Sequence, residues 1–195
     1  GQTLAAALHE PEGPARAWAL FAHCFTCGKD SAAASRIARG LADRGIGVLR
    51  FDFTGLGGSE GDFGNENFSA NVEDLVAAAR WLEDEHGEPQ LLVGHSLGGT
   101  AVLAAAGELP SVQAVATVAA PASPAHVVRH FAERRDEILR EGRAEVDLGG
   151  RPFTIGRAFV EDVEAYPLAE RLGELRKALL FLHAPLDAIV SIDEA

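Results

Sequence analysis

Apolar runs of strand length alternate with amphipathic stretches of helical length along most of this 195-residue chain. The apolar runs are continuous rather than alternating, which is typical of parallel strands that are covered on both faces. They are AWALFAHCF (17–25), GVLRFDF (47–53), QLLVGHS (90–96), VQAVATVAA (112–120) and ALLFLHA (178–184). Amphipathic or small-residue patterns predict helices over 31–44, 68–86 and 97–107. This alternation predicts an α/β fold with a doubly wound, mostly parallel sheet.

One connection, residues 120–177, is far longer than the dozen or so residues that a crossover needs. It begins with a charged stretch of helical pattern over 125–141. The segments AEVDL and RPFTI then flank Gly149-Gly150, a favoured two-residue hairpin turn. A further helical pattern starts at Arg157. We therefore predict a single domain over 1–195, with a cap or lid insertion at about 120–177 that covers the edge of the sheet.

The motif Gly94-His95-Ser96-Leu97-Gly98 is a G-x-S-x-G sequence. The pattern alone is weak, since an ordinary glycine-rich turn or a phosphate cradle can share it. Here it directly follows the strand QLLV and directly precedes the helical stretch LGGTAVLAAA, which is the setting of a nucleophile elbow. This context favours Ser96 as a nucleophile exposed above the sheet.

A second backbone N–H is needed to bind a developing oxyanion, and in this setting it comes from the loop after an earlier strand. That loop runs from His23 to Gly28. By position, we expect the N–H groups of Phe25 and Leu97 to form the oxyanion hole. His23, Cys24 and Cys27 are predicted to support the loop, with the His23 ring tying it down by hydrogen bonds.

The acid of a catalytic triad is expected just past a later strand, and Asp187 is the first carboxylate after ALLFLHA. The order Ser…Asp…His would place the base downstream of Asp187. None of the seven histidines lies there: they are His9, His23, His86, His95, His126, His130 and His183. We expect the catalytic histidine beyond Ala195. The pair His126 and His130 predicts surface side chains rather than a metal site.

Composition limits the partners. The chain has a formal net charge of −12 and no basic stripe, so neither nucleic acid nor an anionic membrane is an expected partner. No apolar run approaches the roughly 20 residues of a membrane span, and the first residues lack the pattern of a signal peptide. These features predict a cytoplasmic protein without a metal or cofactor, acting on a small-molecule acyl substrate.

The chain resembles the hydrolase half of bacterial two-domain proteins in which an α/β-hydrolase domain is followed by an OsmC-like domain. The resemblance rests on HCFTCGKDSAAASRIARGLADRGIGVLRFDFTGLGGSEGDF (23–63), LLVGHSLGG (91–99), EVDLGGRPF (145–153) and HAPLDAIVSIDEA (183–195). It implies a hydrolase of the carboxylic-ester type and an OsmC-like domain downstream. It also implies a first strand before Gly1, and a last strand and histidine loop after Ala195.

Three functions remain open from the sequence. The leading one is a serine hydrolase that acts through an acyl-enzyme. The second is a thiol redox module that uses Cys24 and Cys27, because a CxxC between a strand and a helix is a setting for reactive thiols. The third is a non-catalytic binding domain of hydrolase fold.

Overall fold

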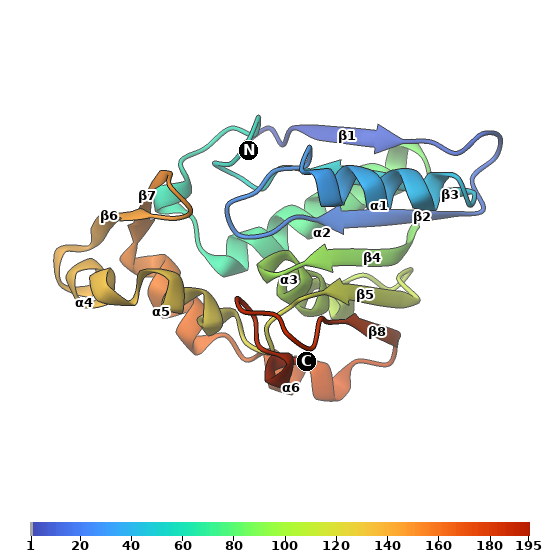
Figure 1. The fold of residues 1–195 in the computed structure, drawn as a ribbon. Coiled ribbons are helices and arrows are strands. Elements are labelled where there is room, and N and C mark those ends of the chain that lie inside the picture. Colours follow the sequence, from blue (N-terminus) through green and yellow to red (C-terminus); the bar gives the residue numbers. More distant parts are fainter. Residues whose placement is uncertain (1) are drawn as a thin grey trace.

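The computed structural model describes residues 2–195 and is built around a six-stranded sheet in the order β1-β3-β2-β4-β5-β8 (Figure 1). The strands are β1 (Ala6–His9), β2 (Ala17–Ala22), β3 (Ile46–Phe51), β4 (Pro89–His95), β5 (Ala114–Val118) and β8 (Ala178–Leu182). β1 runs antiparallel to β3, and the remaining neighbours are parallel. The predicted doubly wound, mostly parallel sheet is confirmed, and each of its five predicted strands is present within a few residues of its apolar run.

The antiparallel edge strand β1 was not predicted. It pairs with β3 from Ala6 opposite Phe51 to His9 opposite Val48, and the Asp52 N–H extends this pairing to the Ala5 carbonyl at 2.9 Å. Its sequence AALH is short and carries little strand preference. The hydrogen-bonding groups of β3 therefore specify this strand more than its own residues do.

Helices cover both faces of the sheet. Helix α1 (Ala32–Ala42) places Ala34 and Ala38 in a small core on one face, together with Phe21 of β2. Helices α2 (Phe68–Glu85) and α3 (Leu97–Ala105) lie on the other face, over the main core. Short 3₁₀ helices occupy η1 (Phe63–Asn65), η2 (Ala106–Glu108) and η4 (Ile192–Glu194).

The long 120–177 segment forms η3 (Pro124–Phe131), α4 (Ala132–Glu141), the hairpin β6 (Arg143–Asp147) and β7 (Pro152–Gly156), α5 (Arg157–Ala165) and α6 (Leu168–Glu174). The predicted hairpin is present, with Asp147 opposite Pro152 and positive φ at Gly149 and Gly150. The helical stretch predicted over 125–141 is present, but it divides at Phe131 into the 3₁₀ helix η3 and the α-helix α4. The backbone of that residue leaves helical values (φ −140°, ψ 30°) and its ring is buried.

In Figure 1, α4, α5 and the β6–β7 hairpin lie at the end of the sheet to which β2, β4 and β5 point. Open α/β sheets bind their ligands at this carboxyl end. Strand β8 forms the edge of the sheet opposite β1, and within the described residues it pairs with β5 alone. Its side chains are exposed: Leu180 and Leu182 are 54% and 50% accessible. Among residues 2–195, no helix has both the length and the apolar character that crossing a bilayer requires.

Candidate active site

Ser96 occupies a sharp turn between β4 and α3. Its backbone has φ 53° and ψ −127°, a conformation that non-glycine residues rarely adopt. The Ser96 N–H donates to the Val118 carbonyl of β5 at 2.9 Å, which holds the turn against the sheet. The Ser96 side chain makes no capping hydrogen bond to the helix that follows. Its hydroxyl is therefore available at the carboxyl end of the sheet.

The two outer glycines of the motif allow close approach of backbones. A Cβ on Gly94 would lie 2.4 Å from the Gly98 carbonyl oxygen. A Cβ on Gly98 would lie 2.1 Å from the carbonyl oxygen of His23 and 2.6 Å from that of Ala22. The first turn of α3 thus lies directly against the end of β2, which brings the elbow next to the loop that follows β2.

That loop carries Phe25 between two bonded cysteines. Cys24 and Cys27 form a disulfide with their Cα atoms 5.2 Å apart, and the Cys27 N–H donates to the Cys24 carbonyl at 3.1 Å. No hydrogen-bond partner for the Phe25 N–H is found within residues 2–195. Leu97 begins α3, so its N–H precedes the first bonds of the helix. Phe25 and Leu97 also line the same small cavity behind the loop.

His23 ties this loop to the end of β3. Its Nε2 lies 3.3 Å from the Phe53 nitrogen, whose N–H can only donate. Nε2 must therefore accept, so Nδ1 carries the proton and donates to the Cys24 carbonyl at 2.7 Å. Burial is the main influence on the pKa of His23 and lowers it below its ordinary value, in keeping with this neutral form. The ring has no free nitrogen left for proton transfer.

Asp52 anchors the neighbouring glycine-rich loop. It is almost fully buried and accepts from the Gly58 N–H at 2.9 Å, the Lys29 N–H at 2.6 Å and the Lys29 ammonium at 3.0 Å. Burial by itself raises the pKa of Asp52, but these donors and the Lys29 charge outweigh it and leave the pKa below its ordinary value. Asp52 is thus a loop-fixing acceptor.

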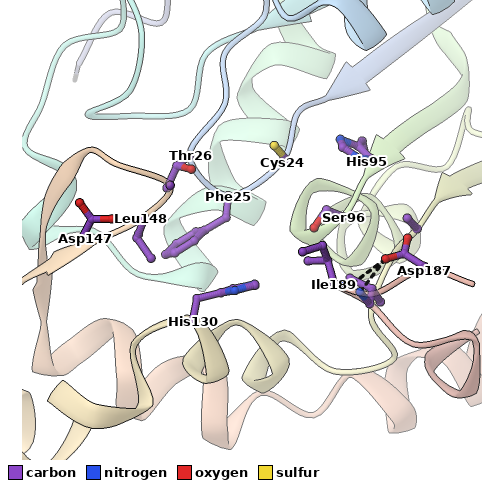
Figure 2. Close-up of a pocket in the computed structure, with 13 residues that line it drawn as sticks. Cys24, Phe25, Thr26, His95, Ser96, His130, Asp147, Leu148, Asp187 and Ile189 are labelled. Carbon is purple, nitrogen blue, oxygen red and sulfur yellow. Dashed lines mark hydrogen bonds between the residues drawn. The ribbon is translucent and has the colours of Figure 1, made fainter.

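Asp187 lies five residues after β8 and faces the same cavity as Ser96 (Figure 2). Its Oδ1 accepts from the N–H groups of Ile189 at 2.8 Å and Val190 at 2.9 Å. The pKa of Asp187 lies below its ordinary value. The hydrogen bond from Val190 is the largest cause, and that from Ile189 is the second. The carboxylate is therefore ionised at neutral pH, with Oδ2 left for another donor.

The cavity that joins these residues has a volume of about 380 Å³. Its lining comes from the loop after β2, the elbow, the 120–177 segment and the loop after β8: Cys24, Phe25, Thr26, His95, Ser96, Ala119, His130, Asp147, Leu148, Gly149, Asp187, Ile189 and Val190. Figure 2 shows Phe25 and Leu148 to the left of Ser96, with Ile189 directly below it. The space suits a small ligand with an apolar part.

The predicted surface position of His126 and His130 was wrong for His126. That ring is buried, with Nδ1 3.0 Å from Glu194 and Nε2 3.1 Å from the Ile189 carbonyl. It therefore holds the loop after β8 against η3, a long-range contact that no local pattern reveals. His130 opens into the cavity across from Ser96, and sequence reasoning did not predict it there.

Within residues 2–195, no hydrogen bond links a histidine to Ser96 or Asp187. His183 bonds through Nε2 to the Val190 carbonyl at 2.7 Å, and His9 bonds to Arg50 at 2.7 Å. His86 packs between Trp18 and Trp81. His95 lines the cavity, and burial lowers its pKa, although the charge of Asp187 acts in the opposite direction.

An aromatic cluster connects the loop after β2 to the 120–177 segment. The Phe25 ring stacks on Phe159 with centroids 5.2 Å apart and 24° between planes. It also contacts Phe131 and Phe63, at 6.5 Å and 5.5 Å. Phe63 in turn meets Phe153 at 5.6 Å. Phe131, Phe153 and Phe159 of the 120–177 segment thus belong to one aromatic cluster beside the elbow.

Comparison with known families matches residues 13–169 to the family described as serine aminopeptidase, S33. Among curated proteins, the uncharacterized protein RP471 of Rickettsia prowazekii (strain Madrid E) is 32% identical over 88 residues, which cover 44% of this chain and 36% of that protein. The uncharacterized protein YfhR of Salmonella typhi is 36% identical over 67 residues, which cover 34% of this chain and 23% of that protein. The matches span about a third or less of these relatives.

Solved structures share the fold over nearly the whole chain. The esterase domain of a Rhodothermus marinus protein is 41% identical, with a TM-score of 0.71, and the match covers 98% of this chain and 80% of that one. Est1E from Butyrivibrio proteoclasticus, solved with ferulic acid bound, is 21% identical with a TM-score of 0.80, and the match covers 99% and 79% of the two chains. The second likeness shows the fold alone.

Proposed function

Because this chain belongs to the serine aminopeptidase (S33) family and has the α/β-hydrolase fold, we propose that it is the core of a serine hydrolase acting on a carboxylic ester or a related acyl substrate. The observation that carries the proposal is Ser96 itself. A hydroxyl on a strained turn, at the start of a helix and facing a cavity that Phe25 also lines, has the arrangement of an acyl-transfer nucleophile.

In the proposed reaction, the Ser96 Oγ attacks the acyl carbon while its proton passes to an imidazole. The carbonyl oxygen becomes an oxyanion, which accepts hydrogen bonds from the N–H groups of Phe25 and Leu97. The imidazolium then protonates the leaving alcohol, and an acyl-enzyme remains. Water, deprotonated by the same imidazole, releases the acid and restores Ser96.

Asp187 is the proposed acid that orients this imidazole. Its Oδ1 is already used by two backbone N–H groups, and these fix the carboxylate with Oδ2 directed elsewhere. A lowered pKa keeps it charged, so that it can stabilise the imidazolium.

The proposed base is a histidine on a segment that follows Ala195 in the full protein. Strand β8 supports this, because the free edge of this apolar strand presents backbone N–H and C=O groups to which a further strand can pair. A histidine loop after such a strand would lie beside Asp187. The proposals of an OsmC-like domain downstream and of a cytoplasmic location rest on the resemblance and composition alone.

The 120–177 segment is proposed to act as a cap that limits substrate size. His130, Asp147 and Leu148 of this segment line the cavity together with Ser96. A cavity of about 380 Å³ suits a short acyl group better than a long chain.

The test is labelling of the full-length protein by a fluorophosphonate, followed by hydrolysis of a series of p-nitrophenyl esters. We expect one labelled serine, Ser96, and turnover that falls as the acyl chain lengthens. The Ser96→Ala variant serves as the control and should take up no label. Labelling without turnover of esters, thioesters or peptides would instead indicate a non-catalytic binding domain. Label that persists in Ser96→Ala would overturn the assignment.

A further inference from the structure

The Cys24–Cys27 disulfide is part of the loop that presents Phe25 to the elbow. The two cysteines face different spaces. Cys24 lines the 380 Å³ cavity that contains Ser96, and Cys27 lines a second cavity of about 540 Å³ on the far side of the loop. Thr26 borders both. Both cysteines are partly exposed, so a small thiol can reach the bond from solvent.

Few other contacts hold the backbone between the two cysteines. The Cys24 carbonyl accepts from the His23 ring and from the Cys27 N–H. The Thr26 carbonyl accepts from the Arg151 guanidinium, which comes from the β6–β7 hairpin. The side chain of Phe25 packs in the aromatic cluster, against Phe159, Phe131 and Phe63. The disulfide is the one covalent tie, and it closes the turn whose middle residue carries the proposed oxyanion donor.

We propose that Cys24 and Cys27 form a reversible redox site that controls the order of this loop, and with it the reactivity of Ser96. The second half of the proposal rests on the proposed hydrolase function. The ligand is a reducing dithiol. Its thiolate attacks one sulfur and forms a mixed disulfide, and the other cysteine leaves as a thiolate, which takes up a proton. The second thiol of the reductant then displaces the remaining cysteine, so the products are two protein thiols and an oxidised cyclic disulfide.

The bonded state is the ordered and more reactive one. A cross-link removes conformations that the open turn can sample. An oxyanion donor contributes through preorganisation, and its complete loss typically costs about 100- to 1,000-fold in turnover. The contacts of this loop with Phe159 and Arg151 remain after reduction, so the N–H of Phe25 stays in place. It is less well held, because the cross-link is lost. We therefore expect a smaller fall, of about tenfold, on reduction.

The experiment uses the full-length protein in a series of buffers that contain reduced and oxidised dithiothreitol. Three quantities are measured in each: alkylation of the peptide containing Cys24 and Cys27, hydrogen exchange of the same peptide, and the rate at which a fluorophosphonate labels Ser96. We expect thiols to appear in one two-electron step, exchange of the 24–27 amides to rise with them, and labelling to slow about tenfold over the same range.

The Cys24→Ser/Cys27→Ser variant is the matched control. Ser96 of this variant should be labelled at the rate seen in the reduced protein, and reductant should not change that rate. Thermal unfolding of the variant shows whether it is folded. A pair that stays reduced in every buffer, or a loop whose exchange is equal in both states, would overturn the redox site. Unequal exchange with equal labelling would overturn the control of Ser96. Absence of label in both states would refute the proposed hydrolase instead, while hydrogen exchange still decides the redox site.

Discussion

Replacing Gly98 by alanine tests whether the first turn of α3 lies as close to the end of β2 as the structure shows. The added Cβ would meet the carbonyl oxygens of His23 at 2.1 Å and Ala22 at 2.6 Å. A carbon–oxygen contact ordinarily needs about 3.3 Å or more, so one backbone must move by roughly 1 Å. Both oxygens belong to backbone, which cannot turn aside as a flexible side chain would.

Two magnitudes follow from that displacement. Overpacking of this kind costs about 1–3 kcal/mol of unfolding free energy, which in a chain of this size lowers Tm by about 2–12 °C. The same shift separates the N–H of Leu97 from the loop of Phe25. A misplacement of about 1 Å in catalytic geometry can cost about 100-fold in rate.

The assay is thermal unfolding together with the rate of fluorophosphonate labelling of Ser96, both in the full-length protein. Gly107→Ala is the matched control, because a Cβ at that exposed position meets no atom within 4 Å. It should leave labelling unchanged and stability equal or slightly higher, since alanine suits helical backbone better than glycine by up to about 1 kcal/mol. If Gly98→Ala has the same Tm and the same rate of Ser96 labelling as Gly107→Ala, α3 does not lie as close to β2 as described. The proposed adjacency of the two oxyanion donors would then be refuted as well.

Three further predictions concern Asp187, Phe159 and His23. Asp187→Asn should slow ester hydrolysis by about 100- to 10,000-fold with little change in Tm, whereas Asp136→Asn, at an exposed position, should leave hydrolysis unchanged. Equal rates of hydrolysis in the two variants would show that Asp187 is not the acid of the triad. Phe159→Ala should cost about 3–5 kcal/mol in urea unfolding, because the ring is 3% accessible and stacks on Phe25; a loss below about 1 kcal/mol would contradict that packing. His23 has a folded pKa below its ordinary 6.5, so its contribution to stability is complete above pH 6.5 and is lost as pH falls through the lower folded value. The pH dependence of unfolding free energy below 6.5 should therefore flatten in His23→Gln, and an unchanged slope would show that His23 is not buried in neutral form.

Much of the sheet was predictable from local pattern. Continuous apolar runs and helical periodicity are properties of neighbouring residues. Both patterns are retained in the folded protein, because they determine which side chains are buried away from water. The elbow was predictable for the same reason, since the motif joins the end of a predicted strand to the start of a predicted helix, and Ser96 lies between the two. β1 was not predictable, because its pairing depends on β3, some 40 residues away in the chain.

The site shows the same division. Ser96 as a nucleophile candidate, and the strand ends that would carry its partners, could be identified from local pattern, because the succession of strands along the chain and the residue types that follow each strand are local features of the sequence. Three features follow from three-dimensional packing alone: the Cys24–Cys27 bond, the burial of His126 against Glu194, and the cavity that His130 and Leu148 share with Ser96. Most of these pairings join residues that are far apart in the chain, so the sequence does not reveal their distance in space. The CxxC is the exception, but its three-residue spacing is equally compatible with a disulfide, a pair of metal ligands or two free thiols. Long-range packing selects among such options, because it alone determines which groups are brought together and which remain in contact with water.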